Sequence, residues 1–143
     1  MNMGAVYPQQ YQRLLDQKAD ELKASFSEFS TPELELFASP KEHYRLRAEF
    51  RIWHQDDDIY YAMFEKGNKR VPIRIDDCPM VAEPIHTLMF DLLEDVRQAP
   101  ELSRKLFQID FLSTLSGEVL VTLLYHRVID ESWEALARPI KEK

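Results

Sequence analysis

The sequence predicts an α+β domain in which helices cover an antiparallel sheet built as three strands, a helix and two strands. Three observations support this fold class. Residues 44–54 alternate apolar and polar side chains, as a half-buried strand does. Short turns separate neighbouring strands, which favours antiparallel pairing. Residues 84–98 carry apolar side chains at helical spacing, which is typical of a helix that packs against a sheet.

The amino-acid composition restricts the classes of function that this protein can have. The chain has 143 residues, enough for one domain with its own core, and a net charge of -7. This charge disfavours a general nucleic-acid coat protein but is compatible with a focused basic patch. The single cysteine, Cys78, excludes an internal disulfide and a cysteine-rich zinc site, and we expect a cytoplasmic location. No apolar run approaches the roughly 20 residues that span a bilayer, so no membrane partner is expected.

The first element is an amphipathic helix over about residues 8–29. Pro8 suits a first helical turn, and apolar side chains recur at steps of three and four from Tyr11 to Phe29. The simplest interpretation is a helix that packs on the sheet or on a neighbouring domain.

The strand over about residues 44–54 has two different faces. One face is apolar, with Leu46, Ala48, Phe50 and Ile52. The other face carries Arg45, Arg47, Glu49, Arg51 and Trp53. Such a face is typical either of an ordinary solvated sheet, with Glu49 pairing its arginine neighbours, or of an RNA surface on which arginines hold phosphates and a ring stacks on a base.

Strands over about residues 58–65 and 70–75 form a hairpin around the Lys-Gly-Asn-Lys turn. Pro72 lacks a donor for the strand ladder, so the second of these strands is expected at a sheet edge. Arg70 and Arg74 are expected to point outward and to extend the basic strip. The inward set is expected to be Val71, Ile73 and Ile75.

A helix over about residues 84–98 precedes two more strands, over about 105–114 and 118–127, and a last helix over about 131–138. The second of these strands is nearly all apolar, which predicts a central position. Pro139 is expected to break or kink the last helix. In the strand over about 105–114, Phe107, Ile109 and Phe111 alternate with Gln108 and Asp110.

Catalytic and ligand-binding motifs are missing from the sequence. There is no Gly-x-Gly-x-x-Gly, no phosphate-binding loop, no His-Glu-x-x-His and no Cys-x-x-Cys. Three adjacent aspartates at 56–58 do not have the ligand spacing of a calcium loop. Two aspartates precede Cys78 and favour its neutral thiol. We therefore expect no catalytic residue, no cofactor and no metal within this chain.

Three stretches resemble the N-terminal part of bacterial tRNA (uracil-5-)-methyltransferases, which use S-adenosylmethionine to form ribothymidine in the T-loop of tRNA. The stretches are SPKEHYRLRAEFRIWH (39–54), KLFQIDFLSTLS (105–116) and VTLLYHR (121–127). The resemblance implies that residues 1–143 form a single RNA-engaging domain. It implies that the family's C-terminal Rossmann-like domain, with the catalytic cysteine, the catalytic base and the S-adenosylmethionine site, lies outside this fragment, which is then inactive alone. Cys78, within DDCPM, lacks the family's context for the nucleophile.

The resemblance also implies particular RNA contacts. Arg51 is the first candidate for an RNA contact, and Phe107 is the candidate for stacking near a flipped base, with Gln108 and His126 beside it. Arg45 and Arg47 are candidates from the strand alternation alone. A buried position for Phe107 remains an open alternative, because it alternates with core residues.

The implied partners are the T-arm of tRNA and the missing catalytic domain. The alternative is a freestanding protein-interaction module without an RNA role. In that case the last helix, with Trp133, Leu136 and Ile140, would expose an apolar patch that docks a partner or drives self-association.

Overall fold

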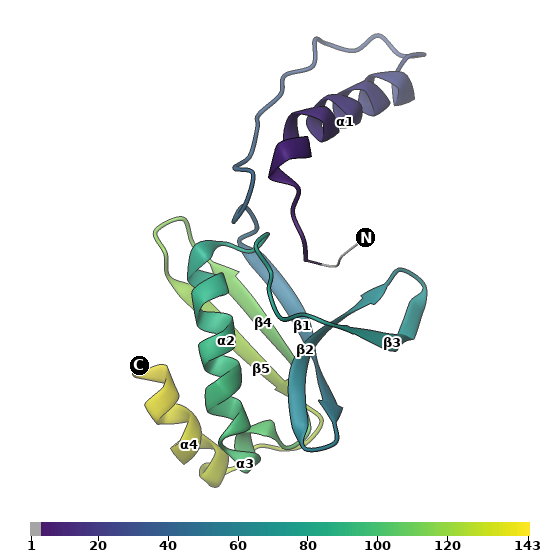
Figure 1. The fold of residues 1–143 in the computed structure, drawn as a ribbon. Helices are drawn as coiled ribbons and strands as arrows, with labels where there is room; N and C mark the ends of the chain where they lie inside the picture. Colours follow the sequence, from purple (N-terminus) through teal and green to yellow (C-terminus); the bar gives the residue numbers. More distant parts are fainter. Residues whose placement is uncertain (1–3) are drawn as a thin grey trace.

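The computed structural model describes residues 4–143 and contains a five-stranded sheet with helices against one face (Figure 1). In chain order the elements are η1 (Pro8–Gln10), α1 (Tyr11–Ser25), β1 (Arg47–Gln55), β2 (Asp58–Glu65), β3 (Asn68–Arg74), α2 (Glu83–Arg97), α3 (Pro100–Ser103), β4 (Leu106–Ser113), β5 (Val119–Tyr125) and α4 (Glu131–Lys141). The predicted α+β fold class is confirmed. Every pairing between these strands is antiparallel, so the described residues contain no doubly wound parallel domain.

The strand order in the sheet is β3-β2-β1-β4-β5, which places β1 at the centre. The burial along β1 alternates as the sequence predicts: Phe50 and Ile52 are buried, whereas Arg47 and Glu49 are exposed. Strand β1 begins at Arg47 and not near residue 44. The preceding residue Arg45 forms an isolated parallel bridge with Val81 instead of joining the sheet ladder.

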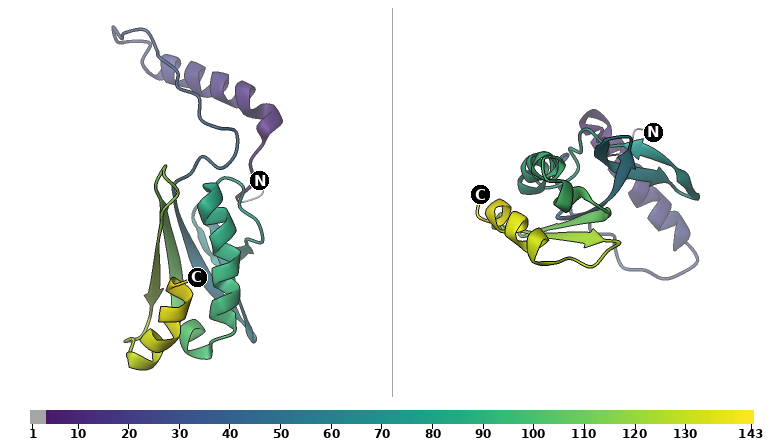
Figure 2. Two further views of the ribbon diagram at one scale, coloured as in Figure 1. Left: turned by 90° about the vertical axis from the view of Figure 1, so that its left-hand side faces the viewer. Right: turned by 90° about the horizontal axis from the view of Figure 1, so that it is seen from below.

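The core lies between the sheet and α2, which crosses one face of it (Figure 2). Ile85, Met89 and Val96 of α2 are fully buried. Tyr61 of β2 is at the centre of this core. Its ring contacts Phe50, with the two ring centroids 5.2 Å apart, and its hydroxyl donates a hydrogen bond of 2.6 Å to the carbonyl of Met89.

Helix α1 is shorter than predicted, and of its two expected packing partners the sheet is excluded, whereas a neighbouring domain stays a prediction (Figure 1). It ends at Ser25 and not near residue 29, because a turn follows in which Phe29 N–H donates to the Phe26 carbonyl. The helix stands apart from the sheet (Figures 1 and 2). Apolar side chains on it and just after it are correspondingly open: Leu22 is 45% exposed, Phe26 49% and Phe29 66%.

Two strand predictions are wrong. Strand β5 lies at a sheet edge and not at the centre, and Leu120 on its outer face is 62% exposed. Its apolar sequence misleads because one set of its side chains covers the core while the other set has no covering layer. Strand β3 is at the opposite edge, as Pro72 predicts. Its Val71, expected to face inward, is 60% exposed because the β2–β3 hairpin extends beyond α2 (Figure 1).

Helix α4 also departs from the prediction. Asp130 caps its start by accepting a hydrogen bond from Trp133 N–H, and the helix continues through Pro139 to Lys141. The proline removes only its own backbone donor, and the helix ends two residues later. Trp133 and Ile140 are partly buried against the core, which leaves only Leu136 of the expected apolar patch exposed.

Candidate nucleic-acid interface

The candidate site lies on the sheet face opposite α2, where β1, β4 and β5 meet side by side. In the ladder, Arg51 of β1 is opposite Gln108 of β4, and Gln108 is opposite Leu124 of β5. Side chains directly opposite each other in antiparallel strands are close enough to touch. The register of the sheet therefore brings Arg51 and Gln108, which are far apart in the sequence, together on one face.

A β-bulge in β4 decides the position of Phe107. Leu106 is paired with Tyr125 and Gln108 with Leu124, so Phe107 is an extra residue without a partner on β5. A bulge shifts the side-chain alternation by one residue. Leu106 and Ile109 are consequently both buried, and Phe107 turns to the outer face. The expectation that Phe107 shares a face with Ile109 is wrong, and the open alternative of a core position is excluded.

Three side chains form the Arg51–Phe107–His126 stack. The guanidinium carbon of Arg51 is 3.4 Å from the centroid of the Phe107 ring. The His126 ring centroid is 3.9 Å from the same centroid, with an angle of 31° between the ring planes. Two groups cannot occupy one ring face at these distances, so they cover opposite faces of Phe107. This order agrees with the sheet, in which β4 lies between β1 and β5 (Figure 1).

The charge of Arg51 is not compensated locally. Among residues 4–143 no carboxylate forms an ion pair with it, and its side chain makes no hydrogen bond. Partial burial lowers the pKa of Arg51, but an arginine stays protonated at neutral pH. Its guanidinium N–H groups thus remain available to a phosphate or to a base edge.

The other candidates differ from Arg51. Gln108 donates a hydrogen bond of 2.7 Å to Asp110, which fixes its amide beside the stack. Arg47 forms an exposed ion pair with Glu49, as expected of an ordinary solvated strand face. Arg45 lies outside β1, and its backbone pairs with the segment before α2. The structure therefore brings together Arg51, Phe107, Gln108 and His126, and leaves Arg45 and Arg47 outside this group.

Sequence reasoning did not single out Lys66 and Lys69, which join Arg70 at the tip of the β2–β3 hairpin. The signal is present in the sequence as three basic residues within the run Lys66 to Arg70. Because Gly67 and Asn68 lie in the same run, its composition indicates a turn first and a charged surface only second.

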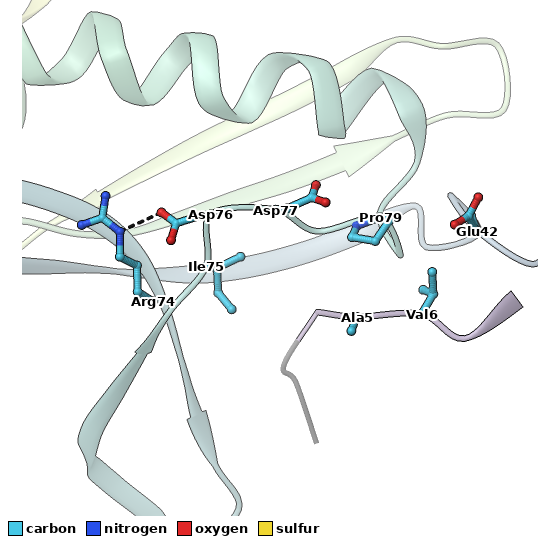
Figure 3. A pocket seen from close by; sticks show the side chains of 8 residues that line it. All are labelled: Ala5, Val6, Glu42, Arg74, Ile75, Asp76, Asp77 and Pro79. Atoms are coloured by element: carbon cyan, nitrogen blue, oxygen red, sulfur yellow. Dashed lines mark hydrogen bonds and ion pairs between the residues drawn. The ribbon is translucent and has the colours of Figure 1, made fainter.

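A pocket beside the N-terminal segment carries a negative charge, which is unsuited to binding RNA. Figure 3 shows this hollow of about 350 Å³, lined by Ala5, Val6, Glu42, Arg74, Ile75, Asp76, Asp77 and Pro79. Arg74 is bound to Asp76, with Nε 2.7 Å from the carboxylate oxygen. The remaining charges in the lining are acidic, so this hollow repels phosphate.

The described residues offer neither a metal site nor a membrane span. Within residues 4–143 no three His, Cys, Asp or Glu side chains are grouped so that they could bind a metal ion. In the same residues, no helix has the length and apolar character that crossing a membrane requires.

Cys78 is a core residue. Its side chain is fully buried, and burial raises the pKa of its thiol, which disfavours the reactive thiolate. We expect a disulfide-exchange reagent at pH 8 to modify the native thiol at least about a hundredfold more slowly than the thiol in urea. Absorbance of the released chromophore measures both rates, and comparable rates would contradict the buried position.

The fold and the site together define an α+β domain whose open sheet face presents a cation stacked on aromatic rings. The sequence profile described as tRNA (Uracil-5-)-methyltransferase matches residues 10–143. The chain belongs to this family.

Named relatives extend this finding. Three proteins called tRNA/tmRNA (uracil-C(5))-methyltransferase are similar to the chain. The protein of Photobacterium profundum is 52% identical over 132 residues, covering 92% of this chain and 36% of the relative. Those of Acinetobacter baylyi and Shewanella loihica are both 49% identical, covering 94% and 99% of this chain and 38% and 39% of the relatives. The chain thus spans less than two-fifths of the length of these relatives.

Proposed function

We propose that this chain is the N-terminal RNA-engaging region of a tRNA (uracil-5-)-methyltransferase that methylates the T-loop uridine at tRNA position 54. S-adenosylmethionine would supply the methyl group in the whole protein. The observation that carries the proposal is the Arg51–Phe107–His126 stack, an uncompensated cation and two rings on an open sheet face. Membership of the family supports tRNA as the substrate.

The stack suits an RNA loop from which a base has been flipped. Flipping costs the stacking energy of the base and its neighbours, and an aromatic surface restores about 1–3 kcal/mol per base. Both faces of Phe107 are already covered, by Arg51 and His126. The free face for a base is therefore the outer face of the His126 ring. Phe107 acts as the spacer that holds His126 and Arg51 in place.

Arg51 and Gln108 would supply the polar contacts. The guanidinium of Arg51 lies over the ring of Phe107, which leaves its edge free for two parallel hydrogen bonds to a phosphate. Gln108 donates to Asp110, which orients the rest of its amide toward an RNA base or ribose. Phosphate contacts position the RNA, and contacts to base edges contribute the selectivity.

The described residues do not fit S-adenosylmethionine. Gly67 and Gly117 lie in hairpin turns with open space around them, and Gly4 lies against Cys78, so none forms part of a glycine-rich cradle before a helix. We therefore assign cofactor binding and catalysis to the part of the parent protein outside this chain, and expect this chain alone to be inactive. The proposed location is the cytoplasm, which the unpaired Cys78 supports.

Replacing His126 with alanine is expected to weaken the binding of a T-arm stem-loop about tenfold, because a stacking face worth about 1–3 kcal/mol is lost. His126→Phe keeps a ring of similar shape and should retain most of the affinity. Thr122→Ala, at an exposed position of β5, the strand that ends just before His126, serves as the control. Fluorescence anisotropy of a labelled stem-loop measures the three affinities.

Anisotropy with the unchanged chain tests the proposal itself. We expect it to bind the T-arm stem-loop more tightly than an unrelated hairpin of equal length, and to lose affinity as salt increases. Binding without selectivity or without salt dependence would contradict RNA recognition by this face. A loss caused equally by His126→Ala and His126→Phe would contradict stacking.

A second candidate function is docking of a protein surface. The open apolar side chains of α1 and the residues after it favour it, among them Leu22, Phe26 and Phe29. The occupant would be the remainder of the parent protein or, in its absence, a second copy of this chain. Sedimentation at high concentration tests self-association, and a monomer throughout would argue against the second copy.

A further inference from the structure

The β2–β3 hairpin extends beyond the body of the sheet. Figure 1 shows it reaching away from α2 and α4. Gly67 forms its turn with φ +85°, and a Cβ atom at that position would meet nothing within 4 Å. The tip is therefore an open arm without packing against the core.

The tip of this arm is strongly basic. Lys66, Lys69 and Arg70 are all exposed, and within residues 4–143 none of them forms an ion pair. Arg74, further along the same strand, is instead bound to Asp58 and Asp76. With the exposed Glu65 beside Lys66, residues 65–70 carry three positive charges and one negative charge, a local excess of positive charge that stands out in a chain of net charge -7.

Protection of a sheet edge does not account for this cluster. Lysines on an edge strand hinder pairing with other chains. Charges that protect an edge strand are most useful along its length. Here the positive charges are instead concentrated at the turn end of the hairpin. Val71 remains apolar and 60% exposed on the same edge. A concentrated positive tip is better suited to binding a polyanion.

We propose that the hairpin tip, Lys66, Lys69 and Arg70, contacts phosphates of the RNA stem while the Arg51–Phe107–His126 stack engages the loop. This inference rests on the proposed function. Ala62 is opposite Arg51 in the sheet, and Gly67 lies about five residues further along the hairpin. At about 3.4 Å per residue the tip lies up to ~17 Å further along the strand direction than Arg51. That reach corresponds to roughly five base-pair steps of a duplex.

The test compares the unchanged chain with K66Q/K69Q/R70Q on two RNAs, the T-arm stem-loop and a single-stranded oligonucleotide of the loop sequence. On the stem-loop the variant is expected to bind about tenfold more weakly at low salt. The slope of log affinity against log salt should fall by about two to three. On the loop oligonucleotide the variant and the unchanged chain should bind equally.

The control is K18Q/K23Q/K141Q, which removes three exposed lysines from α1 and α4 and changes the net charge equally. It should leave the salt slope on the stem-loop unchanged. Equal slopes for both triple variants would overturn the hairpin contact while leaving the proposed function intact, provided that His126→Ala still weakens binding. No binding of the stem-loop by the unchanged chain would overturn both. Equal weakening of the hairpin variant on both RNAs would overturn the assignment to the stem.

Discussion

Arg51→Ala is expected to reduce the affinity of this chain for a T-arm stem-loop by about 30-fold, or ~2 kcal/mol. The variant removes a guanidinium that has no competing carboxylate among the described residues and that covers one face of Phe107. On the proposed function it therefore loses both a phosphate contact and the support of the stack. Anisotropy titration at low salt measures the change, and circular dichroism checks that the fold is retained.

The chain offers a matched control on the same strand and the same face. Arg47 is exposed and paired with Glu49, so Arg47→Ala should change the affinity less than about threefold. Arg51→Lys should retain only part of the affinity, because an ammonium cannot stack on Phe107 and donate in parallel as a guanidinium does. Equal losses for Arg47→Ala and Arg51→Ala would indicate that only net charge matters and would contradict the assigned site.

Tyr61→Ala is expected to lower the free energy of unfolding by about 3–5 kcal/mol. Tyr61 is fully buried and contacts Phe50, Phe90 and Phe111, so alanine leaves a cavity at the centre of the core. Urea denaturation measures the loss. A change below about 1 kcal/mol would contradict the central position of Tyr61.

Tyr61→Phe separates the hydrogen bond from the packing. It keeps the ring but removes the hydroxyl hydrogen bond to the Met89 carbonyl, which lies inside α2 and still accepts a helical hydrogen bond, so the expected cost is about 0.5–1.5 kcal/mol. Burial raises the pKa of the native Tyr61 phenol above its ordinary value near 10. The unfolded phenol therefore ionises first, and the stability from Tyr61 is complete below about pH 10 and declines as the pH rises further.

The difference in unfolding free energy between the unchanged chain and Tyr61→Phe should accordingly shrink above about pH 10. The two proteins differ only at residue 61 and contain the same remaining tyrosines. The difference between their unfolding free energies therefore isolates Tyr61. A difference that stays constant up to about pH 11 would contradict a raised phenol pKa.

The sequence was most informative where one face of an element is buried and the other is solvated. The alternation in β1 and the helical spacing in α2 predicted both elements, and Pro72 predicted an edge strand. The apolar sequence of β5 was misleading, because hydrophobicity does not reveal whether a second layer covers the outer face. The same limit applies to α1. Its amphipathic pattern predicted packing on the sheet or on a neighbouring domain, and in the structure the helix stands apart from the sheet (Figure 1).

By itself, the sequence determined the fold class, the resemblance to one family and the candidate status of Arg51, Phe107, Gln108 and His126. Only the tertiary structure decided which of these side chains meet. Their contact depends on the pairing of β1 with β4 and on a bulge that places Phe107 on the outer face. Simple period-two alternation predicts the opposite face, because a single extra residue in a strand reverses the orientation of every side chain beyond it.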